Sequence, residues 1–241
     1  MTDTAAATAQ EAEGAPKPNW VWRSVILAGL TLAVPATAYF GLIEILTGAR
    51  AGLSKAAAEP LAALAALGLS LLTLKVYNEK ERVGLDLRGL FSVRPLGRKA
   101  ALLAGFGAVD ALLVWGLDLF MARYYPGYEG SGVIAKYWSG NTSWFSMAVS
   151  TILYASCEEI FLRGLVLNYI KKHAGLWTGL LVSSLLFSLM HGGRIWVSLV
   201  FLFVSGLLYG AAFELSGGLA VPCLLHGLHN FVLRAIFLLG L

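Results

Sequence analysis

The chain has 241 residues, of which 58% are hydrophobic and only 13% are charged. A soluble domain carries roughly a quarter charged residues, so the composition excludes an ordinary soluble globular protein and predicts a polytopic all-α membrane protein. The net charge of +4 does not indicate nucleic-acid binding, because the basic residues cluster between apolar runs, as membrane topology requires.

The chain divides into a polar tail and a long membrane domain. Residues 1–18 lack apolar periodicity and are expected to form a mobile tail before a membrane-embedded domain at 19–241. A helix that crosses the hydrocarbon core needs about 20 residues. This length predicts about seven (six to eight) transmembrane helices, at 20–46, 58–77, 99–121, 143–170, 176–191, 195–214 and 219–239. The loop at 122–142 is a candidate lid or substrate rim.

Lysines and arginines predict the orientation of the chain. One side of the membrane collects Lys17, Arg23, Lys80, Arg82, Arg88, Arg94, Arg98, Lys99, Lys171 and Lys172. The opposite side has fewer, namely Arg50, Lys55, Arg123, Lys136 and Arg194. Because basic loops stay in the cytoplasm, we expect a cytoplasmic N-terminus.

The fourth segment holds three charged residues in its stretch CEEIFLRG. A charge at mid-bilayer costs about 2.5–3.5 kcal/mol, so each is a functional candidate. Glu159 and Arg163 are four residues apart and share a helix face, which favours an ion pair. Glu158 is rotated from Glu159 by about 100° and has no cation of its own, which suits a general base. On its own, the trio fits a structural ion-pair cluster equally well.

Two later segments add histidines and an asparagine. His191 ends the fifth segment, and His226 and Asn230 share one face of the seventh. At 1.5 Å per residue, Glu158, His191 and His226 lie about 18, 22 and 10 Å from the cytoplasmic ends of their segments, so we expect them to converge. Such a group can activate water and stabilise an oxyanion. Glu158, His191 and His226 also suit zinc, and the residues leave this choice open.

Other polar and small residues receive structural interpretations. Asp110 lies at the centre of the third segment without an identifiable partner and is expected to join helices by a hydrogen bond. His229 is expected to pack beside the site. Gly206 and Gly210 form a GxxxG step that predicts close helix approach. Arg234, near a helix end, is expected to reach water by snorkelling.

Three short patterns follow one another within the predicted helices. They are EExxxR (Glu158, Glu159, Arg163), FxxxH (Phe187, His191) and HxxxN (His226, Asn230). Together they resemble the CAAX protease and bacteriocin-processing family of intramembrane proteases, the type II CAAX prenyl endopeptidases. The resemblance covers about residues 143–234, and residues 1–142 carry no motif of the family.

The resemblance implies an intramembrane endopeptidase that hydrolyses a peptide bond of a membrane-associated or lipidated protein or peptide. It implies that Glu158 activates water and that Glu159 and Arg163 orient and stabilise Glu158. It further implies that His191 assists with the water or the leaving group. His226 and Asn230 would bind the oxyanion. It implies no certain cofactor, with zinc left open. It also implies an integral protein of a bacterial inner membrane.

Two functions of other classes compete with the protease. The first is a non-catalytic membrane scaffold, or a bacteriocin-immunity partner, that keeps the charge cluster for stability. The second is a proton-coupled transporter, which predicts repeated halves that the sequence does not contain. Other intramembrane proteases fit less well, because the sequence has no HExxH, GxGD or GxSxG pattern.

Overall fold

The computed structural model describes residues 20–48, 51–80, 84–125, 143–191 and 196–239. The expected tail at 1–18 and most of the expected lid at 122–142 lie outside these residues. The described helices are α2 (Trp20–Thr47), α3 (Lys55–Lys80), α4 (Leu87–Leu90), α5 (Leu96–Tyr124), α7 (Trp144–Glu159), η1 (Ile160–Leu167), α8 (Asn168–Ala174), α9 (Leu176–Met190), α10 (Trp196–Ser216) and α11 (Ala220–Leu239).

All seven segments predicted to cross the membrane are helical, which confirms the all-α fold. Within the described residues, four helical stretches are long and apolar enough to span a bilayer: Lys55–Lys80, Leu96–Tyr124, Trp144–Ala174 and Trp196–Ser216. Helix α9 has only 15 residues, about 22 Å of helix, which is shorter than the hydrocarbon core. The short helix α4 was not predicted from the sequence; it begins where Asp86 accepts a hydrogen bond from the Arg88 backbone N–H.

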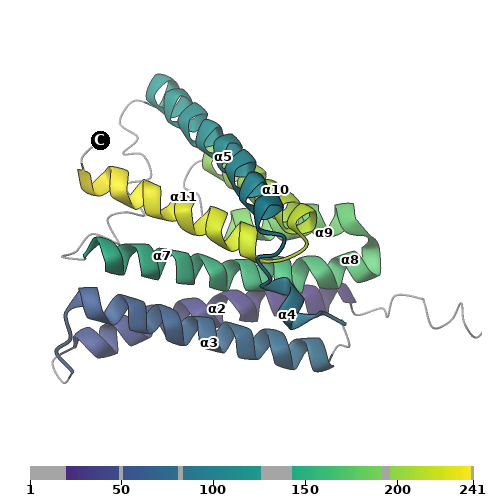
Figure 1. The fold of residues 1–241 in the computed structure, drawn as a ribbon, viewed down its shortest axis with the longest axis horizontal. Coiled ribbons are helices and arrows are strands. Elements are labelled where there is room, and N and C mark those ends of the chain that lie inside the picture. Colours follow the sequence, from purple (N-terminus) through teal and green to yellow (C-terminus); the bar gives the residue numbers. More distant parts are fainter. Residues whose placement is uncertain (1–19, 49–50, 81–83, 126–142, 192–195, 240–241) are drawn as a thin grey trace, which may run out of the picture.

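One continuous helical stretch forms the centre of the molecule. Figure 1 shows α7, η1 and α8 in line, with α11 packed on one side and α2 and α3 on the other. This stretch begins after Ser143, whose side chain accepts from the Ser146 N–H. It ends at Gly175, whose φ of +85° is readily adopted only by glycine. The chain then reverses into α9.

The central stretch contains a π-helix, whereas the sequence predicts regular helix over 143–170. Element η1 follows directly on Glu159, and all eight of its residues are buried. Just after its end, the Asn168 side-chain amide donates hydrogen bonds to the carbonyls of Arg163 and Gly164 in its middle, at 2.9 and 3.1 Å. π-Helices are rare in proteins, and those that occur frequently lie at functional sites. No residue pattern in this stretch distinguishes it from an ordinary apolar helix.

Close helix contacts depend on glycine, as the GxxxG step predicts. A Cβ atom at Gly206 of α10 would lie 2.9 Å from the Ser184 Cα of α9. A Cβ at Gly227 of α11 would lie 2.8 Å from the Ile152 Cα of α7. Both contacts are with backbone atoms, so these helices can approach this closely only because the side chain is absent.

A buried ion pair corrects one prediction. Arg234 of α11 does not reach water; it is only 3% exposed and lies 3.2 Å from Glu59 of α3. The partner is 175 residues away in the sequence, so helix spacing gives no sign of the pair. The ion pair joins α3 to α11 one turn beyond Asn230, the last motif residue of α11.

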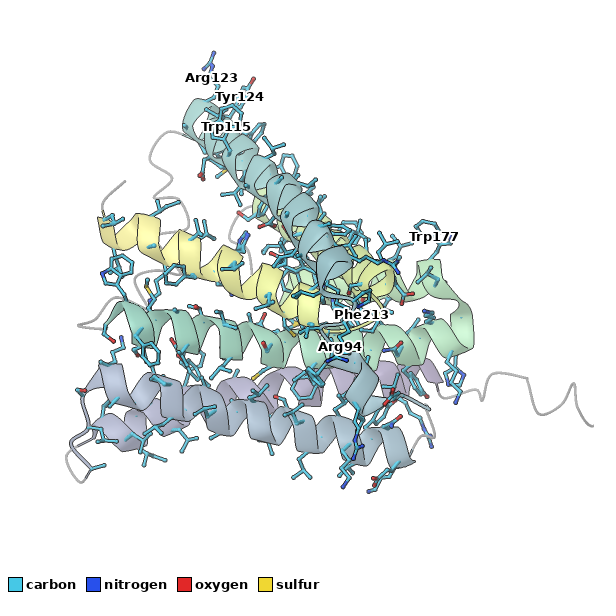
Figure 2. All side chains as sticks on the ribbon, in the orientation of Figure 1. Arg94, Trp115, Arg123, Tyr124, Trp177 and Phe213 are labelled. Carbon is cyan, nitrogen blue, oxygen red and sulfur yellow. The ribbon has the colours of Figure 1, made fainter. Side chains whose placement is uncertain are left out.

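Large aromatic side chains at several helix ends are exposed, as interface residues are expected to be. Trp144, Trp177 and Trp196 are each more than half exposed at the first or second residue of their helices. Figure 2 shows Trp115 and Tyr124 at the end of α5 that leans away from the rest of the bundle, and Trp177 projecting outward from the start of α9. The exposed aromatic residues at these helix ends are placed as in the aromatic belts of membrane proteins.

Candidate active site

Glu159 and Arg163 form the predicted ion pair. Arg163 Nη1 lies 2.9 Å from Glu159 Oε1, and both side chains are fully buried. Arg163 Nη2 also donates to the Gly206 carbonyl at 2.8 Å, which ties η1 to α10. The guanidinium lies over the rings of Phe187 and Tyr209, 5.1 and 5.6 Å from their centroids. Two buried charges thus neutralise each other inside a cage of aromatic rings.

Glu158 faces the two motif histidines, as predicted. Its Oε2 atom lies 3.7 Å from His191 Nε2 and 3.8 Å from His226 Nε2. This oxygen is buried and makes no hydrogen bond with any residue that the structure describes. The separations exceed a direct hydrogen bond and match polar groups that share a bridging water.

Backbone and side-chain acceptors fix both imidazole rings. His191 Nδ1 lies 2.8 Å from the Phe187 carbonyl, which can only accept, so this nitrogen carries hydrogen. His226 Nδ1 lies 2.9 Å from Glu159 Oε1. With both Nδ1 atoms donating, each neutral ring presents an unprotonated Nε2 to Glu158.

The contact between Glu159 and His226 is the part of the site that sequence reasoning missed. The sequence predicts that Glu159 pairs with Arg163 and supports Glu158, but it predicts no contact with His226; in the structure one oxygen, Oε1, binds both Arg163 and His226. The two residues are 67 positions apart on different helices, so only the shared family motifs connect them in the sequence. Glu159 therefore orients His226 while Arg163 balances its charge.

Asn230 is the one motif residue that the structure does not join to the others. It lies one turn beyond His226 on α11 and is partly buried. Its side chain makes no hydrogen bond to another described residue. Its role at an oxyanion stays a prediction from the HxxxN spacing.

Glu158, His191 and His226 are the candidate zinc ligands. Ligand atoms of a tetrahedral zinc lie roughly 3.4 Å apart, given metal–ligand distances of about 2.0–2.1 Å. The distances from Glu158 Oε2 to the Nε2 atoms of His191 and His226, 3.7 and 3.8 Å, are slightly longer than this. Among the residues that the structure describes, no three or more His, Cys, Asp or Glu side chains are placed to hold a metal ion. The zinc site formed by Glu158, His191 and His226 stays a prediction.

Asp110 has a partner that the sequence could not identify. Its Oδ2 atom lies 2.6 Å from His229 Nδ1, and its Oδ1 accepts from the Tyr209 hydroxyl at 3.4 Å. The predicted helix-joining role of Asp110 and the place of His229 beside the site are both confirmed. Tyr209 carried no signal in the sequence, because it is a single tyrosine in an apolar helix.

The fold and the site define an integral membrane protein whose helix bundle encloses a glutamate–histidine cluster beside a buried ion pair. Residues 140–232 match the family model described as "Type II CAAX prenyl endopeptidase Rce1-like". The resemblance inferred from the motifs is thus confirmed over this segment, which covers less than half of the chain and contains all the motif residues. The chain has no match among curated proteins or among solved structures.

Proposed function

We propose that the chain is an intramembrane endopeptidase that hydrolyses a peptide bond of a membrane-associated or lipidated protein or peptide with water activated by Glu158. The observation that carries this proposal is the Glu158 oxygen that has no hydrogen-bond partner among the described residues and is faced by two Nε2 atoms at 3.7 and 3.8 Å. The Glu159–Arg163 pair supports it, because Glu158 needs no part in charge neutralisation.

The first chemical step uses the space between these three atoms. A water bound there donates one hydrogen bond to Glu158 and another to a histidine Nε2. As the water oxygen attacks the carbonyl carbon of the peptide bond, its proton passes to Glu158 as general base. The product of the step is a tetrahedral intermediate with a negative oxygen.

The second step needs a donor for that oxygen and a proton for the leaving amine. His226 Nε2 can take up a proton from bulk water before the substrate binds, and the Glu159 carboxylate at Nδ1 stabilises the resulting imidazolium. Its Nε2–H then donates a hydrogen bond to the oxyanion and keeps its proton throughout the step. The Asn230 side-chain amide, one turn along α11, supplies a further donor. The C–N bond then breaks, and Glu158 returns its proton to the amine, directly or through His191.

The expected surroundings follow from the same residues. Buried apolar helices on every side of η1 favour a substrate that is itself in or at the bilayer, since a soluble peptide would not enter an apolar bundle. The positive-inside bias favours a cytoplasmic N-terminus, and we propose a bacterial inner membrane as the location.

The test compares cells that contain the wild-type chain with cells that contain Glu158→Gln, a variant of nearly the same shape. Mass spectrometry of membrane-protein fragments and new C-termini should show a set of products that disappears in the variant while the level of folded protein is unchanged. Glu44→Gln, which alters an exposed glutamate of α2, is the matched control. Identical fragment sets in all three strains would favour the scaffold or immunity function instead.

A further inference from the structure

A second buried polar cluster lies beside the proposed catalytic residues. It consists of Asp110 from α5, Tyr209 from α10 and His229 from α11. The Asp110 carboxylate binds both partners, through Oδ2 to His229 Nδ1 and through Oδ1 to the Tyr209 hydroxyl. Asp110 is 5% exposed and Tyr209 is 1% exposed. None of the three residues belongs to the three motifs, and Asp110 lies outside the matched segment.

Tyr209 connects this cluster to His226. Its ring stacks on the His226 ring, with centroids 5.0 Å apart and an interplanar angle of 21°. The hydrogen bond from His226 Nδ1 to Glu159 fixes one edge of the imidazole but leaves the ring free to tilt about that bond. The stacked tyrosine fixes the plane of the ring. Together, the two contacts direct Nε2 toward Glu158.

Asp110 in turn determines where the tyrosine ring can lie. The hydrogen bond to His229 fixes the carboxylate, so that Oδ1 faces the Tyr209 hydroxyl. Helix α5 has few other buried anchors, namely Lys99 and Met121 near its two ends, and Figure 1 shows it leaning away from α11 toward its C-terminus. An acidic side chain in the middle of such a lipid-facing helix is costly and calls for a function.

We propose that Asp110 is a positioning residue for the reaction: it holds the Tyr209 ring against His226 and so keeps His226 Nε2 directed at Glu158. The expected effect on rate rests on the proposed function. The expected effect on the His226 ring does not.

The experiment has one arm that does not require catalysis. The protein has four histidines, so NMR of histidine-labelled protein in micelles gives few ring signals, each assigned by substitution. A tyrosine ring stacked at 5.0 Å shifts the His226 ring protons. Asp110→Asn and Tyr209→Phe should each move these signals, because both weaken the hold on the tyrosine ring. Asp118→Asn, at an exposed position of the same helix, is the matched control and should leave them in place.

The second arm measures cleavage of an internally quenched, farnesylated CAAX peptide in liposomes. Asp110→Asn and Tyr209→Phe should lower kcat roughly 10- to 100-fold, the usual effect of a small misplacement of a reacting group, with KM within about twofold. Asp118→Asn should match the wild type. If the wild-type protein does not cleave this peptide, the prenylated substrate class is wrong, and the NMR arm still decides the positioning role.

Two results would overturn the inference. The first is unchanged His226 signals in both Asp110→Asn and Tyr209→Phe. The second is a loss of folded protein with kcat per folded molecule unchanged, which would show that the cluster only joins helices. Tyr209→Phe keeps the aromatic volume in the core, so it remains informative if Asp110→Asn does not fold.

Discussion

Removal of the Arg163 side chain should destabilise the protein strongly. The guanidinium makes an ion pair with Glu159 at 2.9 Å and a hydrogen bond to the Gly206 carbonyl at 2.8 Å, at a position with no solvent exposure. Arg163→Met leaves the Glu159 charge buried without its cation. Breaking one partner of such a pair costs about 3–5 kcal/mol, a large part of the stability of a typical domain.

The matched variants are Glu159→Gln and the double variant Glu159→Gln/Arg163→Met. The double variant leaves no unpaired charge buried. Its loss of unfolding free energy should therefore be about 2–3 kcal/mol smaller than the sum of the losses of the two single variants. The free energy of unfolding of the wild type and the three variants is measured in mixed micelles with increasing amounts of a denaturing detergent, and unfolding is followed by tryptophan fluorescence. If the free energy of unfolding of Arg163→Met were within about 1 kcal/mol of the wild-type value, the buried ion pair would not stabilise the fold as predicted.

Three further predictions concern packing, catalysis and metals. Gly206→Ala should destabilise the protein by about 1–3 kcal/mol, because its Cβ would meet the Ser184 backbone at 2.9 Å; Gly116→Ala, which has open space around it, should not. His191→Ala should abolish cleavage yet leave the melting temperature nearly unchanged, since the side chain is 22% exposed and, among the described residues, its one hydrogen bond is with the Phe187 carbonyl. Cleavage should persist after treatment with a zinc chelator, and its loss, with recovery on adding zinc, would support the metal alternative instead.

The helices were predictable because the bilayer fixes both their length and their composition. The Glu159–Arg163 pair was predictable too, since residues four apart on a helix meet regardless of what surrounds them. The π-helical turns of η1 were not, and yet the ion pair persists at its start. The prediction of the ion pair from residue spacing was therefore correct, although the prediction of regular α-helix over this stretch was wrong.

Contacts between helices that are far apart in the sequence could not be predicted from the sequence alone. Motif spacing indicated that Glu158, His191 and His226 would meet, but it gave no sign that Glu159 would orient His226. The pair of Asp110 and His229 joins residues 119 positions apart. Helix periodicity tells which face a residue occupies, and only the packing of α5, α10 and α11 determines which faces meet.

The most direct test of the account measures the purified protein in liposomes with a precursor identified in the cell comparison. The initial rate of peptide-bond cleavage by the wild type should exceed that of Glu158→Gln by roughly 10²–10⁴-fold, the contribution expected of a general base. The two proteins should have equal thermal stability. A rate for Glu158→Gln within tenfold of the wild type would contradict the claim that Glu158 activates the water.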